Sequence, residues 1–198
     1  MTFGKIRIFG TRMCRGENMV LVLFADGFEE IEALTPVDML RRAGVEVVTA
    51  GISGKSALGS HGIRVMLDSA PEEIDLSGVD MVIFPGGMPG SLNLDASPLT
   101  DEVIDAVQKN GGRLAAICAA PLVLGRRGLL SGKEAICYPG FEDELKGAKI
   151  SERSVITDGN ITTAKGMGVA LEFSLELVSL ICGKEKARGL SLAVMRDK

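Results

Sequence analysis

The sequence of 198 residues contains no tryptophan, one tyrosine, one histidine and four cysteines. The cysteines, Cys14, Cys118, Cys137 and Cys182, stand at wide, irregular spacings and form no C-x-x-C pair. With a single histidine to join them, this pattern predicts neither a zinc site nor a disulfide framework. We therefore expect free thiols, a cytoplasmic location and no bound metal.

Long apolar runs and an excess of positive charge are also missing. No run reaches the roughly 18 to 20 apolar residues that cross a bilayer. The formal net charge is -4, so the chain lacks the excess of basic residues that would attract nucleic acid. These absences exclude a membrane and nucleic acid as expected partners. A single domain of this length can bury a core without disulfides or metal.

Residues 1–18 differ in character from the rest of the chain. Lys5, Arg7, Arg12 and Arg15 are spread among a few apolar residues, and a hydrophobic run starts at Met19. The segment lacks the apolar stretch of a secretory signal. We interpret residues 1–18 as a non-catalytic extension and residues 19–198 as one domain. A weak targeting peptide, an upstream start site or an added edge strand stay open as explanations of the extension.

Short apolar runs alternate with stretches of helical period. The predicted strands are 20–24, 45–49, 81–84, 114–117, 135–137, 155–157 and 161–164; the predicted helices are 29–42, 98–110, 121–128 and 169–182. Nearly continuous apolar strands are typical of a parallel sheet that is covered on both faces. The alternation predicts an α/β fold, with a hairpin turn at 158–160. In such sheets, ligands bind beyond the carboxyl ends of the strands.

Cys118 is the most informative residue of these loops. It follows the predicted strand 114–117 and precedes a helix that opens near Pro121, which places a thiol at a sharp turn. Backbone N–H groups and the helix N-terminus stabilise a thiolate there, so we predict a lowered pKa and a nucleophile. The alternative is a buried cysteine that acts as a small hydrophobe.

The loop after the first strand is acidic, with Glu29, Glu30 and Glu32 in the first turn of a predicted helix. The helix dipole alone favours carboxylates there. However, Ile31, Leu34 and Val37 mark the expected buried stripe, and Glu32 lies beside it. We therefore predict that Glu32 points inward, where burial raises the pKa of its carboxyl.

The loop after the strand 81–84 contains Gly86 and Gly87. Adjacent glycines permit close backbone approach and also occur in ordinary tight turns. Combined with the cysteine turn, the N–H groups of Gly87 and Ala119 are predicted to form an oxyanion hole.

Segments 25–32, 84–87 and 116–121, in this order and spacing, resemble the signature blocks of the DJ-one/ThiJ/PfpI superfamily, and the likeness extends from about residue 20 to residue 195. The resemblance is to the ThiJ/deglycase-type branch rather than the PfpI protease branch. It implies a flavodoxin-like three-layer sandwich with a mostly parallel central sheet, a strand-to-helix nucleophile elbow and, usually, a homodimer.

The resemblance also implies roles for individual residues. Cys118 takes the nucleophile position, and Glu32 supplies the protonated carboxyl that hydrogen-bonds the thiolate. Gly87 and Ala119 supply the oxyanion N–H groups. Two further residues resemble substrate-binding positions: His61 matches a basic anion-binding residue, and Arg42 matches an arginine that a partner subunit lends to the pocket.

Two positions depart from relatives of this kind. Ala119 stands where the protease branch typically has histidine, which removes the general base that peptide hydrolysis needs. Tyr138 stands where some deglycase-type members have histidine. Asp38, which resembles the acidic partner of that histidine, is then left without a clear catalytic task.

These residues lead to two hypotheses of different classes. The first is a cofactor-independent, cysteine-dependent glyoxalase or deglycase-like enzyme that acts on methylglyoxal-type dicarbonyls or their adducts. The second is a redox-sensing, stress-protective protein or chaperone that uses oxidation of the same cysteine. A protease or amidase is disfavoured by Ala119. A thiamine-pathway role is disfavoured because no phosphate-binding motif is present.

Overall fold

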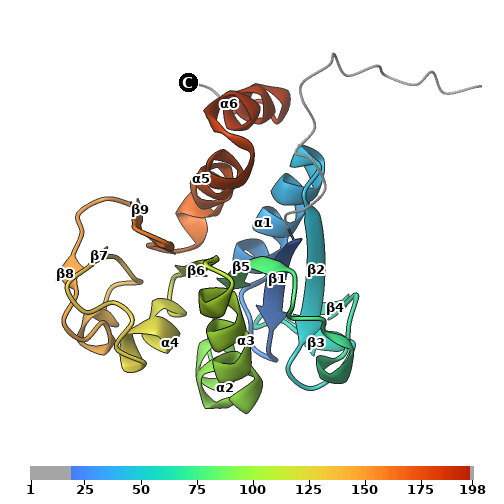
Figure 1. Ribbon diagram of the computed structural model, residues 1–198, viewed down its shortest axis with the longest axis vertical. Helices are drawn as coiled ribbons and strands as arrows, with labels where there is room; N and C mark the ends of the chain where they lie inside the picture. The colour runs from blue at the N-terminus through green and yellow to red at the C-terminus, as the bar shows by residue number, and fades with distance from the viewer. Residues whose placement is uncertain (1–18, 197–198) are drawn as a thin grey trace, which may run out of the picture.

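The computed structural model describes residues 19–196, and the predicted extension 1–18 lies outside this range. A six-stranded sheet of order β2-β1-β5-β6-β10-β9 forms the centre (Figure 1). Its strands are β1 (Met19–Phe24), β2 (Glu46–Gly51), β5 (Val79–Phe84), β6 (Arg113–Ile117), β9 (Val155–Asp158) and β10 (Ile161–Ala164). All neighbours pair in parallel except β9 and β10. The predicted α/β fold is therefore confirmed.

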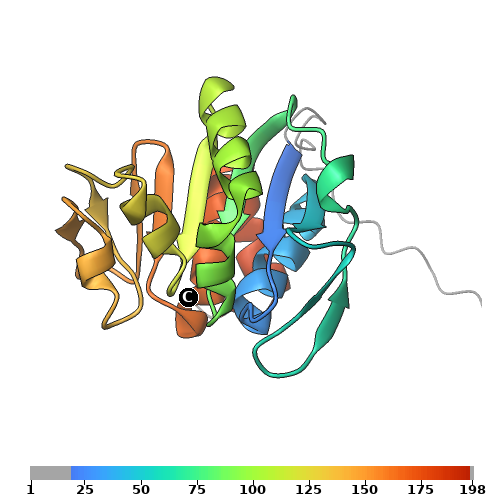
Figure 2. The same cartoon turned by 90° about the horizontal axis from the view of Figure 1, so that it is seen from below.

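Helices cover both faces of the sheet (Figure 2). One layer contains α1 (Glu30–Ala43), α5 (Ala170–Cys182) and α6 (Lys184–Ala193), and the other contains α2 (Gly90–Ala96), α3 (Pro98–Lys109) and α4 (Pro121–Arg126). Alternate residues of β1 pack into the two hydrophobic cores. Leu21 and Leu23 pack against the layer of α2, α3 and α4, whereas Val20 and Val22 pack against the layer of α1, α5 and α6. This period of two explains the continuous apolar run, because both faces of the strand are buried.

Smaller elements lie outside the central sheet. β3 (Ser56–Leu58) and β4 (Arg64–Met66) form an antiparallel hairpin, and β7 (Glu134–Ala135) pairs in parallel with β8 (Lys149–Ile150). Three short 3-10 helices are η1 (Pro71–Glu73), η2 (Glu142–Glu144) and η3 (Met167–Val169). The predicted turn between β9 and β10 is confirmed, with Gly159 at a φ of 64°. Within residues 19–196, no helix has the length and apolar character needed to cross a membrane.

The predicted buried stripe of α1 is partly wrong. Ile31 and Leu34 are exposed, whereas Glu30 and Glu32 are buried. The buried face continues through Ala33, Pro36, Val37 and Leu40. The loops at 59–63 and 86–87 cover the first turn of α1, so its carboxylates occupy positions that would otherwise hold apolar side chains.

Gly125 shows how tightly the layers fit. It lies in α4 against η2, where an added Cβ would overlap the carbonyl oxygen of Glu144 and lie 2.9 Å from Leu145 Cα. We expect Gly125→Ala to lower the free energy of unfolding by about 1–3 kcal/mol, measured by urea denaturation. Gly189 in α6 is the matched control, since an added Cβ there meets no atom within 4 Å. Gly189→Ala should stabilise the protein by roughly 0.5–1 kcal/mol. Equal stabilities of the two variants would contradict this view of the α4 packing.

Candidate active site

Cys118 occupies a strained turn between β6 and α4. Its φ is 64°, a left-handed conformation that is uncommon for residues other than glycine. Hydrogen bonds hold its backbone on both sides: the Cys118 N–H donates to the Ala164 carbonyl (2.9 Å), and the Tyr138 N–H donates to the Cys118 carbonyl (2.8 Å). Strain of this kind persists where neighbouring structure enforces it, as at a nucleophile elbow.

The structure brings four of the predicted site residues together. The Glu32 carboxyl and the N–H groups of Gly87 and Ala119 all face the Cys118 sulfur. Gly86 makes this approach possible: a Cβ there would overlap Glu32 Oε2 and lie 2.6 Å from Cys118 Cβ. A glycine is therefore required where the start of α1 meets the elbow.

Burial dominates the electrostatics of the Cys118–Glu32 pair. It raises the pKa of Glu32 to about 7, with a further rise from the charge of Glu29. Both carboxylate oxygens are buried and lack a partner with full hydrogen-bond geometry, although the Cys118 thiol and two N–H groups face them and lower the pKa in part. The inward position of Glu32 and its raised pKa match the sequence prediction.

The pKa of the Cys118 thiol is shifted in the direction opposite to the prediction. Burial, followed by the charge and hydrogen bond of Glu32, raises its pKa to about 12, and the N–H groups of Ala119 and Gly87 offset only part of this. The prediction of a lowered Cys118 pKa is therefore wrong. While Glu32 is ionised, a Cys118 thiolate would place a second negative charge beside its carboxylate. Between about pH 7 and pH 12 the pair therefore carries one negative charge and one proton, and this proton can lie on the sulfur or on the carboxyl oxygen.

Two residues that border the pair, Gly166 and Met167, were missed by sequence reasoning. A Cβ at Gly166 would lie 3.9 Å from both Cys118 Sγ and Glu32 Oε1, and 3.3 Å from the Tyr138 ring. The Met167 N–H faces the Glu32 carboxyl. Gly166 and Met167 follow the last parallel strand, so the rule that ligands bind at carboxyl ends of strands would have found them. Tyr138 is half-exposed at the edge of the site.

The two predicted substrate-binding residues contact acidic side chains rather than Cys118, although His61 shares a hollow of about 250 Å³ with Met167. His61 Nδ1 is 3.0 Å from Glu30 Oε2 and 3.3 Å from Glu29 Oε2, and these neighbours raise the pKa of His61. Arg42 pairs with Asp38 at 2.6 Å on the exposed side of α1. Within residues 19–196 of one chain, neither His61 nor Arg42 forms a hydrogen bond or ion pair with Cys118. Their roles in substrate binding stay predictions.

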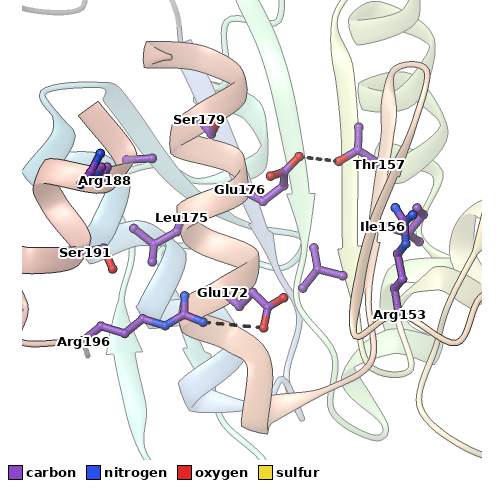
Figure 3. Close-up of a pocket in the computed structure, with 12 residues that line it drawn as sticks. Arg153, Ile156, Thr157, Glu172, Leu175, Glu176, Ser179, Arg188, Ser191 and Arg196 are labelled. Carbon is purple, nitrogen blue, oxygen red and sulfur yellow. Dashed lines mark hydrogen bonds and ion pairs between the residues drawn. The ribbon is translucent and has the colours of Figure 1, made fainter. Parts of the chain in front are cut away.

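A polar groove of about 480 Å³ lies between β9 and the helices α5 and α6 (Figure 3). Two interactions span its walls: Thr157 donates to Glu176 at 3.0 Å, and Arg196 lies 3.8 Å from Glu172. None of the predicted site residues lines this groove, so it is separate from the Cys118 site.

The cysteines differ in state. Cys118 is partly exposed and Cys137 is buried, and both are free. Cys182 is disulfide-bonded, so the prediction of free thiols is wrong at that position.

A mostly parallel α/β sandwich with a cysteine on a strained strand-to-helix turn belongs to the class of proteins with a nucleophile elbow. Residues 18–180 match the DJ-1/PfpI family. The chain belongs to this family, in agreement with the resemblance of its signature blocks.

Several relatives share nearly the whole chain. Protein dj-1beta of Drosophila melanogaster is 37% identical over 180 residues, which cover 87% of this chain and 96% of the relative. A Caenorhabditis elegans relative named glutathione-independent glyoxalase DJR-1.2 is 32% identical over 180 residues, covering 90% of this chain and 96% of its own. The solved structure of oxidized Toxoplasma gondii DJ-1 superposes with a TM-score of 0.86 at 34% identity, covering 91% of this chain and 99% of that one.

Proposed function

We propose that the protein is a cofactor-independent, cysteine-dependent glyoxalase or deglycase-like enzyme that acts on methylglyoxal-type dicarbonyls or their adducts. The observation that carries the proposal is the strained Cys118 sulfur, which faces one carboxyl and two backbone N–H groups. The sulfur can act as a nucleophile, the carboxyl as a proton acceptor and the two N–H groups as an oxyanion hole. The glyoxalase name of the C. elegans relative supports this chemistry.

In the first step, Cys118 Sγ attacks the aldehyde carbon of methylglyoxal, and a carbon–sulfur bond forms. Glu32 takes up the thiol proton as the sulfur attacks. The aldehyde oxygen becomes an oxyanion that accepts hydrogen bonds from the Gly87 and Ala119 N–H groups. Glu32 then gives this proton to the oxyanion, which completes the hemithioacetal and leaves a carboxylate that can act as a base.

In the second step, Glu32 removes the proton from the former aldehyde carbon and returns one to the neighbouring carbon, while the hydroxyl proton on the first carbon passes to the oxygen of the second. This transfer oxidises the first carbon and reduces the second, so no external oxidant is needed. The product is a thioester of lactate on Cys118. Water then attacks the thioester, releases lactate and restores the thiol. The sum is one methylglyoxal and one water converted into one lactic acid.

Purified protein tests this proposal directly. Methylglyoxal should be converted into lactate in the absence of glutathione, measured by coupled lactate detection. Absence of lactate at millimolar methylglyoxal, from protein whose Cys118 reacts with iodoacetamide, would refute the enzyme proposal.

Redox sensing by the same cysteine is the second candidate function. Cys118 is partly exposed, whereas Cys137 is buried, and the similar solved structure of Toxoplasma gondii DJ-1 is of the oxidized protein. Two molecules of peroxide would oxidise the thiol through sulfenate to sulfinate, and each would be reduced to water. We expect peptide mass spectrometry to find two added oxygens on Cys118 before any on Cys137. Equal oxidation of the two residues would contradict a sensing role for Cys118.

We also propose a homodimer. Ile31, Leu34 and Ile63 are exposed around a hollow that Arg42 borders, and exposed apolar surface of this kind marks interaction sites. A second copy would cover it and bring the partner's arginine near the pocket. Light scattering should give twice the chain mass, and Leu34→Glu should give monomers; a monomeric wild type would refute the proposal.

The cytoplasmic location stays a prediction.

A further inference from the structure

We propose that Glu29, Glu30 and His61 form a binding site for a divalent transition-metal ion of the zinc type, next to the Cys118 site but separate from it. The spacing of the cysteines argues against zinc at the thiols, but it carries no information about a site made of oxygen and imidazole. Each of the three residues offers one ligand atom, and these atoms lie within 4.8 Å of one another. The proposal does not depend on turnover at Cys118.

The fold builds this cluster from two segments that are distant in sequence. The tip of the β3–β4 hairpin folds onto the start of α1, where Ser60 N–H donates to the Phe28 carbonyl at 2.8 Å. Gly59 leaves room for the buried carboxylate, since a Cβ there would overlap Glu30 Oε1. Backbone contacts therefore fix the position of the hairpin tip and of the buried Glu30 carboxylate relative to each other.

The distances from His61 Nδ1 to the two carboxylates fit a tetrahedral ion. His61 Nδ1 lies 3.0 Å from Glu30 Oε2 and 3.3 Å from Glu29 Oε2. The Ser60 hydroxyl lies 3.1 Å from His61 Nδ1 and 3.2 Å from Glu29 Oε2. Metal bonds of about 2.0–2.1 Å separate tetrahedral ligands by roughly 3.3 Å. Three side chains thus supply ligands, and the hydroxyl or a water takes the fourth position.

Neighbouring groups orient the buried ligand. The Glu30 side chain is only 7% exposed, and its Oε1 accepts hydrogen bonds from the N–H groups of His61 (2.9 Å) and Ile63 (3.4 Å). Oε2 is thereby directed at the imidazole. Hydrogen bonds that fix a carboxylate in this way are typical of the groups surrounding metal ligands.

Charge also favours a cation. Two carboxylates face one imidazole, and within residues 19–196 of a single chain no lysine or arginine forms an ion pair with either of them. One imidazole nitrogen with carboxylate oxygens suits zinc, whereas calcium and magnesium prefer all-oxygen sites with more ligands. The competing explanation is a plain ion pair between a protonated His61 and the two carboxylates.

Titration of the full chain with Zn²⁺ separates these explanations. A Cys118→Ala background removes the partly exposed thiol as a ligand. We expect one Zn²⁺ per chain by calorimetry and a higher melting temperature with the ion. His61→Ala and Glu30→Gln should each weaken binding by about 10–100-fold and remove the rise in melting temperature. Asp38→Asn, on the same helix but outside the cluster, should bind like the background.

Three outcomes would overturn the proposal. The first is the absence of saturable Zn²⁺ binding by the Cys118→Ala background. The second is binding that His61→Ala leaves unchanged, which would place the ion elsewhere. The third is a rise in melting temperature that persists in His61→Ala. Because Glu30 is buried, the exposed His61 variant decides the result if Glu30→Gln does not fold.

Discussion

Cys118→Ala is expected to reduce lactate formation from methylglyoxal by about 10³-fold or more, because the variant has no atom that can form the carbon–sulfur bond. The Gly87 and Ala119 N–H groups remain in place, but without the covalent adduct no oxyanion develops where they can stabilise it. Turnover at saturating methylglyoxal, without glutathione, measures the effect. Circular dichroism and melting temperature verify that the variant is folded.

A second cysteine provides the control for this prediction. Cys137 is also free but is buried away from solvent, so Cys137→Ala should keep most of the turnover. Cys118→Ser keeps the size and shape of the side chain while supplying a much poorer nucleophile, and it should resemble Cys118→Ala. Substantial turnover in both Cys118 variants would show that the sulfur is not the nucleophile.

The central fold was predictable because its signal is local. The strands at 20–24 and 114–117 read as apolar runs since both of their faces are buried. The β3–β4 hairpin and α6 were not predicted for the converse reason. In β4 the side chains are mostly exposed, and in α6 only Ala187 is buried. Elements that bury little leave no apolar period in the sequence.

The site was predictable to the extent that it depends on where strands end. Cys118, Gly87 and Ala119 were found because parallel strands place their carboxyl ends at one edge of the sheet. The need for Gly86 could not be found, since it arises from contact between α1 and the elbow. The direction of the Cys118 pKa was also hidden, because it depends on how close the Glu32 charge lies.

The cluster of Glu29, Glu30 and His61 was beyond sequence reasoning for a further reason. His61 is 31 residues from Glu30, and it is carried by a hairpin that has no strong strand signal. The predicted stripe of α1 placed Ile31 and Leu34 inside, which left no expectation that Glu30 is buried. Only the path of the hairpin brings these residues together.

Glu32→Gln is expected to lower methylglyoxal turnover by about 10²–10⁴-fold, because an amide cannot accept and return the proton that the mechanism moves. The variant keeps the size of the side chain, so the position of the Cys118 sulfur should change little. Lactate formation measures the loss, and iodoacetamide labelling verifies that the sulfur stays accessible. Turnover close to that of the wild type would show that Glu32 is not the proton carrier.

The same substitution should change the dependence of stability on pH. Burial raises the folded-state pKa of Glu32 from 4.5 to about 7, and the groups that face it are the Cys118 thiol, the Glu29 carboxylate and the N–H groups of Gly86 and Met167. Between these pH values the folded state binds more protons than the unfolded state, so its stability is full below about pH 4.5 and falls as the pH rises through 7. The shift corresponds to about 3 kcal/mol. Urea denaturation at pH 5 and pH 8 should show this decline in the wild type and a much smaller one in Glu32→Gln. Equal declines would mean that Glu32 does not titrate near pH 7. Together with lost turnover, a more stable variant at pH 8 would show that the wild type keeps a destabilising buried carboxyl because the chemistry needs it.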